Sequence, residues 1–283
     1  MAQQVWFITG ASSGFGTEIA LKALQTGAKV VGTVRSRQRA SDAVEKIENA
    51  GGECVELDVA DAPSCSRVFK QVESKHGGVD VLVNNAGMSW RGPIEDFSDE
   101  EAKDQFEVNF HGPLRLIRAS LPGFRARQHG TIVNLSSSAG LDARPSVGLY
   151  AASKFALEGL TESLAAELSP HNINVLLVEP GAFRTKFLGA GKVPAALNAD
   201  QYPIAKTFME NFDKADGRQP GDPVKAAARI VEAVTGEGMA GGLRGKVLRM
   251  PLGPDCVRRL EGKIEVLGRD LEKARGVAMS TDL

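Results

Sequence analysis

Short apolar runs alternate with amphipathic stretches over the first two thirds of the chain. The apolar runs are rich in β-branched residues, which is typical of strands buried on both faces of a sheet. In the stretches between them, apolar residues recur three and four positions apart, which predicts helices. The expected strands are Val5–Thr9, Lys29–Val34, Glu53–Leu57, Val79–Val83, Thr131–Leu135 and Ile173–Val178, and the expected helices lie near 15–26, 38–50, 64–76, 100–127 and 149–169.

This alternation predicts an α/β fold with parallel strands, right-handed crossovers and helices on both faces of the sheet. Toward the end of the chain, Pro223–Val234 and Pro254–Arg275 read as helices, and Gly245–Met250 as a last strand. No repeat or Pro/Gly-rich linker divides the chain. We therefore expect one domain over residues 1–283, with an irregular insertion at roughly 183–222.

Composition narrows the class of protein. The chain has 283 residues, 42% of them hydrophobic, a net charge of −1 and a pI of about 6.5, so neither nucleic acid nor an acidic membrane surface is favoured as a partner. The sequence shows no signal-peptide pattern and no apolar run long enough to span a membrane, and we expect a cytoplasmic protein. Three cysteines without ligand spacing predict reduced, structural thiols and no metal site.

A glycine-rich loop follows the first expected strand. The residues TGASSGFG at 9–16 lead from that strand into a helix, with the spacing Gly-x3-Gly-x-Gly. Glycines let the backbone approach a pyrophosphate, which the amides at a helix N-terminus then bind. The spacing differs from the commoner G-x-G-x-x-G pattern but keeps its strand-turn-helix context. A purely structural glycine turn fits the same residues.

The end of the second expected strand indicates which dinucleotide binds. An acidic residue at this position would accept a hydrogen bond from the ribose 2′-hydroxyl of NAD. Here the strand ends in Val34 and Arg35. Valine cannot accept that bond, whereas arginine can bind a 2′-phosphate. The sequence therefore favours NADP(H) over NAD(H), although Arg37 and Arg39 also fit a solvated helix start.

The stretch from 131 to 160 carries the candidate chemistry. Tyr150 and Lys154 stand at positions i and i+4 of an expected helix, so that the phenol and the ammonium share one face. A tyrosine that acts as an acid or base near neutral pH needs its pKa lowered by about 3 units, and a nearby cation has that effect. Ser137 follows the preceding strand, at the edge where ligands collect in such sheets. We expect Ser136 and Ser138 to be turn residues.

Taken in order, these motifs resemble those of the short-chain dehydrogenases/reductases. The resemblance covers roughly residues 1–190. It rests on TGASSGFG at 9–16, LDV at 57–59, NNAG at 84–87, Asn109, Ser137, Tyr150-x-x-x-Lys154 and PG at 180–181. Glu179, directly before the PG turn, departs from the usual pattern.

The resemblance implies a Rossmann-type, doubly wound sheet of about seven strands and a catalytic set of four residues. In that set Ser137 binds the substrate oxygen, Tyr150 donates the proton, Lys154 tunes the phenol and binds the nicotinamide ribose, and Asn109 orients a water that relays protons. Residues implied to contact the cofactor, besides Tyr150 and Lys154, are Gly10, Ser12, Ser13, Gly14, Phe15, Gly16, Arg35, Asp58, Val59, Asn84, Ala86, Gly87, Pro180, Gly181, Phe183 and Thr185.

The expected function is an NADP(H)-dependent carbonyl reductase or alcohol dehydrogenase. Apolar residues such as Phe187 in the segment 183–222, read as a mobile substrate lid, indicate a hydrophobic ketone, aldehyde or secondary alcohol of steroid-, retinoid- or polyketide-like character. A 3-oxoacyl thioester reductase and a non-catalytic NADP-binding sensor or scaffold are the alternatives. Many relatives pair through the helices that carry Asn109 and Tyr150. We therefore expect a homodimer or homotetramer, with spare apolar surface at Leu157, Leu160, Leu164 and Leu168.

Overall fold

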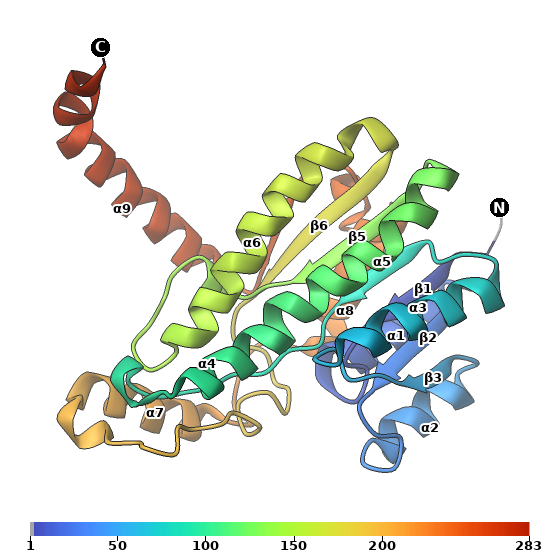
Figure 1. Cartoon of the computed structure of the whole chain (residues 1–283), viewed down its shortest axis with the longest axis horizontal. Coiled ribbons are helices and arrows are strands. Elements are labelled where there is room, and N and C mark those ends of the chain that lie inside the picture. Colours follow the sequence, from blue (N-terminus) through green and yellow to red (C-terminus); the bar gives the residue numbers. More distant parts are fainter. Residues whose placement is uncertain (1–2, 283) are drawn as a thin grey trace.

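The computed structural model describes residues 3–282, and across them seven parallel strands form one sheet (Figure 1). Their order, β3-β2-β1-β4-β5-β6-β7, reverses direction between β1 and β4, which creates a crevice at the carboxyl ends of these two strands. The expected doubly wound sheet is confirmed. The strands are β1 (Val5–Ile8), β2 (Lys29–Val34), β3 (Glu53–Glu56), β4 (Val81–Asn84), β5 (Gly130–Leu135), β6 (Ile173–Pro180) and β7 (Arg249–Leu252).

Helices cover both faces of the sheet. Residues of α1, α2 and α8 share one buried cluster with the sheet, and residues of α3, α5 and α6 share the other. The last helix, α9, projects away from the sheet (Figure 1). The bounds are α1 Gly14–Gln25, α2 Ser41–Asn49, α3 Ala62–His76, α4 Asp99–Phe106, α5 Gly112–Arg127, α6 Gly148–Leu168, α7 Pro203–Ala215, α8 Pro223–Thr235 and α9 Pro254–Ala278.

The alternation of side chains along β1 shows how the sheet joins its two helical layers. Trp6 and Ile8 pack into the cluster of α1, α2 and α8, whereas Val5 and Phe7 pack into the cluster of α3, α5 and α6. All four are buried, and Phe7 meets Phe69 of α3 edge-on at 5.2 Å between ring centroids. A strand that is apolar at every position is therefore placed where both of its faces are covered.

The long helix expected over 100–127 is interrupted. Between α4 and α5, the five residues Glu107–His111 form a π-helical turn, and Asn109 lies at its centre. Such turns insert a residue into a helix and are frequent at functional sites. Periodicity predicts the helical path but not this insertion, because both forms bury similar side chains.

The segment 183–222 is more ordered than the irregular, mobile insertion expected from its glycines and prolines. It contains α7, and its path is fixed by contacts with the loop after β4. The backbone of Lys192 exchanges two hydrogen bonds with that loop, donating to Ser89 at 2.9 Å and accepting from Arg91 at 2.8 Å. The Lys192 ammonium also pairs with Asp104 of α4 at 2.7 Å. The segment is therefore not irregular throughout, because it contains α7 and is held to the loop after β4; its role as a mobile lid stays a prediction.

The apolar face expected on α6 is used inside the chain. Leu157, Leu164 and Leu168 are buried, and Leu160 packs against the same cluster as Leu164. Most of this apolar face is thus used within the chain, and Leu160 is half-buried. None of the helices in the described part of the chain is long and apolar enough to cross a membrane.

A buried ionic cluster ties β6 and β7 to α6. Arg249 of β7 pairs with Glu158 of α6 at 2.7 Å, with Glu162 at 2.5 Å and with Glu179 of β6. The Glu179 side chain is fully buried, and its Oε2 atom has no hydrogen-bond partner within the described structure. Glu179, which departs from the usual pattern before the PG turn, is therefore shielded from solvent and faces this arginine.

The charge of Glu179 costs stability. Burial, with a smaller contribution from Glu158, raises its pKa to about 7, although Arg249 opposes the rise. The folded state therefore holds a proton that the unfolded state releases near its ordinary pKa of about 4.5. The stability that this carboxyl contributes in its protonated form is lost as the pH rises from about 4.5 to about 7. Above that range the folded state bears the full cost of burying the charged carboxylate.

We therefore expect Glu179→Gln to raise the melting temperature at pH 8 but not at pH 5. The expected gain in the free energy of unfolding at pH 8 is on the order of 1–3 kcal/mol. Thermal melts across this pH range measure the difference. Glu162→Gln is the matched control, because it removes a charge from the same arginine at a position that is 56% exposed. A stability difference between Glu179→Gln and the unmodified protein that does not change with pH would contradict the assignment.

Candidate active site

The glycine loop after β1 has the geometry of a phosphate site. Gly10 and Gly14 adopt φ values of 66° and 54°, which favour glycine, and α1 begins at Gly14. A Cβ atom on Gly16 would lie 2.2 Å from the carbonyl oxygen of Gly10, so no larger residue fits there. The preceding Ser13 does not cap α1 with its side chain, which leaves the first amides of the helix available to an anion.

The loop after β4 holds the glycine loop in place. Asn85 donates from Nδ2 to the carbonyl oxygens of Thr9, at 2.8 Å, and Gly10, at 3.1 Å. The Thr9 hydroxyl in turn accepts hydrogen bonds from the backbone amides of Asn85 and Ala86, both at 3.0 Å. The sequence motif contains two asparagines, and the second one performs this role.

Asn84 was expected to line the cofactor cleft, but its side chain is buried inside the sheet. It donates to Asn134 of β5 at 2.8 Å, and Asn134 donates to Thr161 of α6 at 2.9 Å. Asn84 is the last residue of β4, where side chains alternate strictly between the faces, so its side chain points into the sheet, and its place in the cofactor cleft stays a prediction. Its neighbour Asn85 lies past the strand and can turn toward the loop.

Arg35 lies exposed at the end of β2 and forms neither a hydrogen bond nor an ion pair with other described residues. Arg37, by contrast, is held by the Cys54 carbonyl oxygen at 2.5 Å and by Glu48 at 2.9 Å. The two arginines of one short cluster thus differ: one is committed to the fold, and the other is available. Asp58 is exposed beyond β3, and Val59 is buried against Gly112.

Ser137, Tyr150 and Lys154 meet where β5 ends and α6 begins. The Lys154 ammonium donates to the carbonyl oxygen of Leu135 at 2.7 Å and lies 5.8 Å from the centroid of the Tyr150 ring. Ser137 follows β5 directly, and its hydroxyl interacts with the Tyr150 phenol. Gly87, the last residue of the NNAG motif, lies beside Lys154, because a Cβ atom there would be 3.8 Å from the ammonium.

Burial dominates the acid-base properties of this set. It raises the pKa of Tyr150 to about 12, although the Ser137 hydroxyl and the charge of Arg259 both act in the opposite direction. Burial also lowers the pKa of Lys154 to about 8, against the effect of Glu158. The lowering of the tyrosine pKa expected from Lys154 is therefore not seen. In this structure the phenol therefore keeps its proton at neutral pH.

Asn109 is fully buried rather than facing solvent. Its Nδ2 donates to the carbonyl oxygen of Met88 and to the hydroxyl of Ser153, both at 3.0 Å, and its Oδ1 accepts from the Met88 amide at 3.0 Å. Ser153 lies on α6 between Tyr150 and Lys154. The π-helical turn thus connects the loop after β4 to the helix that carries the tyrosine and lysine.

The segment after β6 lies against the glycine loop. The Phe183 ring meets Phe15 at 5.1 Å, and a Cβ atom on Gly14 would lie 3.0 Å from Thr185. At the end of β6, the amide of Gly181 donates to the carbonyl oxygen of Leu252 at 2.8 Å. The expected contact residues from Pro180 to Thr185 therefore border the same crevice as the glycine loop.

Aromatic side chains from the segment 183–222 cover the tyrosine. The Phe187 ring lies 5.6 Å from the Tyr150 ring, and Phe212 of α7 packs on the small cluster that contains Tyr150 and Val147. The wall on this side of the phenol is apolar. Ser146, in the loop before α6, has a φ of 68°, which is unusual for a residue with a side chain.

Three features of the site were missed or misread in the sequence. Arg259 of α9 donates to the hydroxyl of Ser138 at 2.7 Å and pairs with Asp142, so Ser138 is more than a turn residue. Ser136 likewise donates to Glu158 at 2.6 Å. Asp255, also on α9, accepts from the Ala182 amide at 2.8 Å. No pattern within the helix 254–278 distinguishes these two charged residues from the others on its surface.

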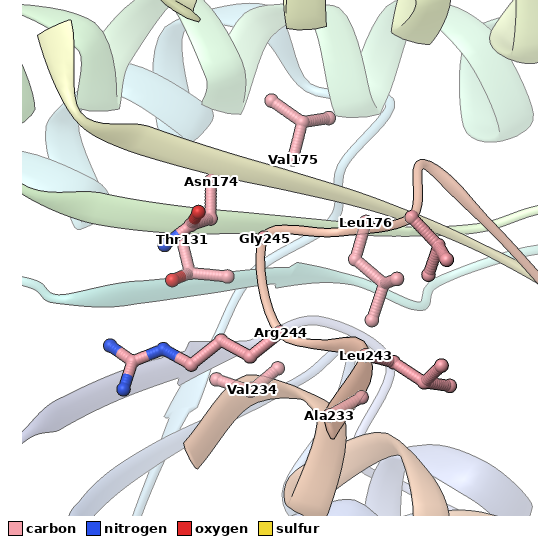
Figure 2. Close-up of a pocket in the computed structure, with 10 residues that line it drawn as sticks. Thr131, Asn174, Val175, Leu176, Ala233, Val234, Leu243, Arg244 and Gly245 are labelled. Atoms are coloured by element: carbon pink, nitrogen blue, oxygen red, sulfur yellow. The ribbon is translucent and has the colours of Figure 1, made fainter. Parts of the chain in front are cut away.

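A small pocket and the cysteines lie apart from this set of residues. The pocket in Figure 2 lies at the opposite, amino-terminal end of the strands, where Thr131, Asn174 and Gly245 meet. Its volume of about 10 Å³ has room for one water at most. The three cysteines are free and buried, and burial raises the pKa of each thiol. Within residues 3–282, no cluster of histidine, cysteine and carboxylate side chains could hold a metal ion.

Comparison with known sequences identifies related enzymes. A family model described as short chain dehydrogenase matches residues 4–192. The chain is 47% identical over 195 residues to Oxidoreductase claN of Passalora fulva, covering 69% of this chain and 88% of that protein. It is 41% identical over 251 residues to human Retinol dehydrogenase 8, covering 82% of this chain and 79% of that protein.

Solved structures show the same architecture. A short-chain dehydrogenase from Streptomyces avermitilis superposes with a TM-score of 0.87 at 38% identity, covering all of both chains. One from Burkholderia phymatum in complex with NAD gives 0.79 at 25% identity, covering 94% and 95%. A metagenomic short-chain oxidoreductase in complex with NADP gives 0.59 at 38% identity, covering 64% and 83%. Together with the crevice and the Ser137, Tyr150 and Lys154 set, these matches show that the chain belongs to the short-chain dehydrogenase family of oxidoreductases.

Proposed function

We propose that the chain is an NADP(H)-dependent carbonyl reductase that acts on a hydrophobic ketone or aldehyde, and on the matching alcohol in reverse. The observation that carries this proposal is the grouping of three residues around the Tyr150 phenol: the Ser137 hydroxyl acts on the phenol, the buried Lys154 ammonium lies 5.8 Å from the ring centroid, and the Phe187 ring lies 5.6 Å away. A carbonyl oxygen placed between serine and tyrosine would receive two hydrogen bonds, and its carbon would lie toward the crevice.

The residues that would hold the dinucleotide fit that group. The amides at the start of α1 and the glycines of the loop suit its pyrophosphate, and the unpaired Arg35 suits a 2′-phosphate. Phe183 and Thr185 border the crevice beside Gly14. When bound, the nicotinamide supplies the hydride.

The acid-base groups assign the reacting proton to the phenol. Tyr150, its pKa raised to about 12, carries the proton that we assign to the substrate oxygen as the carbon gains hydride; at that pKa it is a weak acid, so the bound cofactor and substrate must lower its pKa toward neutral pH for efficient transfer. The Ser137 hydroxyl stabilises the developing negative charge on that oxygen. Lys154, with its pKa lowered to about 8, is positioned to return a proton to the phenol. Asn109 holds the loop after β4 and α6 together, and we propose that it also orients the water that supplies this lysine.

The class of substrate follows from the wall of the site. Phe187 and Phe212 present apolar surface next to the reacting phenol. Burying such surface against a ligand stabilises a hydrophobic substrate by about 25 cal/mol per Å². The similarity to Retinol dehydrogenase 8 supports the same class.

The cofactor preference is tested at Arg35. A charge-assisted contact with a phosphate contributes roughly 1.5–3 kcal/mol to binding. The lower end of that range corresponds to about tenfold in affinity, so we expect NADP to bind at least tenfold more tightly than NAD. Arg35→Ala should remove most of this difference, as measured by dissociation constants for both dinucleotides. Arg37→Ala is the matched control, because the Arg37 side chain is already paired with Glu48. The preference of this variant for NADP over NAD should stay unchanged. Equal affinities in the unmodified protein would contradict the proposal.

The role of the phenol is tested by Tyr150→Phe. This change keeps the ring and removes the proton donor, so turnover should fall by about 10²–10⁴-fold while NADPH still binds. A panel of carbonyl substrates that includes steroids, retinoids and 3-oxoacyl thioesters, followed by NADPH absorbance, gives the rates.

Two outcomes would decide against this role. Turnover by Tyr150→Phe at the unmodified rate would exclude the phenol as the acid. If the unmodified protein oxidises no NADPH with any member of the panel yet binds the cofactor tightly, a binding-only sensor explains the site better.

A further inference from the structure

Among residues 3–282, the outer part of α9 makes no contact that explains its apolar side chains. From Ile264 to Ala278 every residue is exposed, and the helix extends away from the sheet into solvent (Figure 1). Its contacts with the rest of the chain lie at its base, where Cys256 is buried, Arg259 binds Ser138 and Lys263 lies 6.0 Å from the Phe155 ring. The remaining turns therefore stand alone.

Such a helix is poorly stable by itself. Gly262, Gly268 and Gly276 lie inside it, and each costs about 1 kcal/mol relative to alanine in a helix. None of them is required by packing, because a Cβ atom at any of the three positions would meet nothing within 4 Å. Isolated helices of this length are marginal in water even for good helix-forming sequences. A partner that packs along α9 would supply the missing stability.

The apolar residues of α9 follow the pattern of a coiled coil. Seven of them recur at alternating spacings of three and four residues along the helix and form one continuous seam, while Val266 and Val277 lie off it. Three large members of the seam are strongly exposed: Ile264 at 61%, Leu267 at 55% and Leu271 at 54%. The seam consists of Val257, Leu260, Ile264, Leu267, Leu271, Ala274 and Ala278.

The choice of residues in the seam favours a pair of helices. Val257 and Ile264 are β-branched and occupy the first apolar position of their heptads, and Leu260 and Leu267 occupy the second. This combination favours two strands over three or four. A two-stranded pair is what two copies of the same helix would form around a twofold axis.

The charges beside the seam are complementary to those of a second α9. In a parallel pair, Asp270 of one helix would face Arg275 of the other; in an antiparallel pair, Lys263 would face Asp270. The helix carries six basic and five acidic residues, interspersed along it. That mixture does not favour an anionic membrane surface, which attracts helices with a strongly basic face.

We propose that α9 pairs along this seam with α9 of a second copy of the chain, as a two-stranded coiled coil. This surface differs from the leucines of α6, which are buried within the chain. The proposal does not depend on the reaction or the cofactor, and it assigns the covering of the exposed seam to the protein itself.

Light scattering of the full chain at micromolar concentration tests the pairing. Ile264→Lys/Leu271→Lys places charges in the seam, so we expect the mass of the assembly to halve. Glu265→Lys/Glu272→Lys is the matched control, because each of these residues directly follows one of the two seam residues but lies off the seam. This variant changes the net charge by more than the seam variant does, yet it should leave the mass unchanged. The seam variant should still fold, so its melting temperature should stay close to that of the unmodified protein at the same concentration. It should be lower only by the stabilisation that assembly gives to the folded state.

Three results would overturn the proposal. One is an unmodified chain that is monomeric at this concentration. Another is a seam variant with the same mass as the unmodified chain, which would place any assembly elsewhere. The third is a monomer that sediments with phosphatidylcholine/phosphatidylserine vesicles, which would assign the exposed seam to a lipid surface.

Discussion

The close approach of the loops after β1 and β4 is the constraint on which the site depends. A Cβ atom on Gly10 would lie 2.8 Å from the Cα of Ala86, so the two backbones touch at the point where the strand order reverses. Thr9 and Asn85 fix this contact with hydrogen bonds in both directions. One loop leads to α1, where we propose that the cofactor phosphate binds, and the other lies beside Lys154; on that proposal, their contact sets the distance between the cofactor and the acid-base groups.

Burial of charge is the second constraint, and it extends behind the tyrosine. Lys154, Glu158 and Glu179 are all buried within a few turns of one another along α6 and β6. Arg249 compensates the two carboxylates, and the Leu135 carbonyl oxygen accepts from the lysine. Lys154 and Glu179 have shifted pKa values because burial removes water from their charged forms, and perturbed groups of this kind cluster where proton transfer occurs.

The sequence predicted most of the sheet, the glycine loop and the meeting of Ser137 with Tyr150, because each follows from local periodicity or from the end of a strand. It failed where the outcome depends on contacts between distant segments. Asn85 rather than Asn84 reaches the glycine loop, and the segment 183–222 is held by Lys192 and contains a helix. The last strand, β7, begins at Arg249, four residues later than the expected start at Gly245. Arg259 could not be identified, because its role depends on where α9 meets the loop after β5.

The π-helical turn at Glu107–His111 separates the requirements of the fold from those of the site. An α-helix advances about 100° per residue, so removing one residue from this turn would restore a regular helix and rotate everything before it by about that angle relative to α5. Such a deletion would leave α5 packed on the sheet, since α5 begins after the turn. Asn109, however, would no longer face both Met88 and Ser153. The buried position of Asn109 therefore depends on the one residue that the π-helical turn inserts, and not on any particular side chain in that turn.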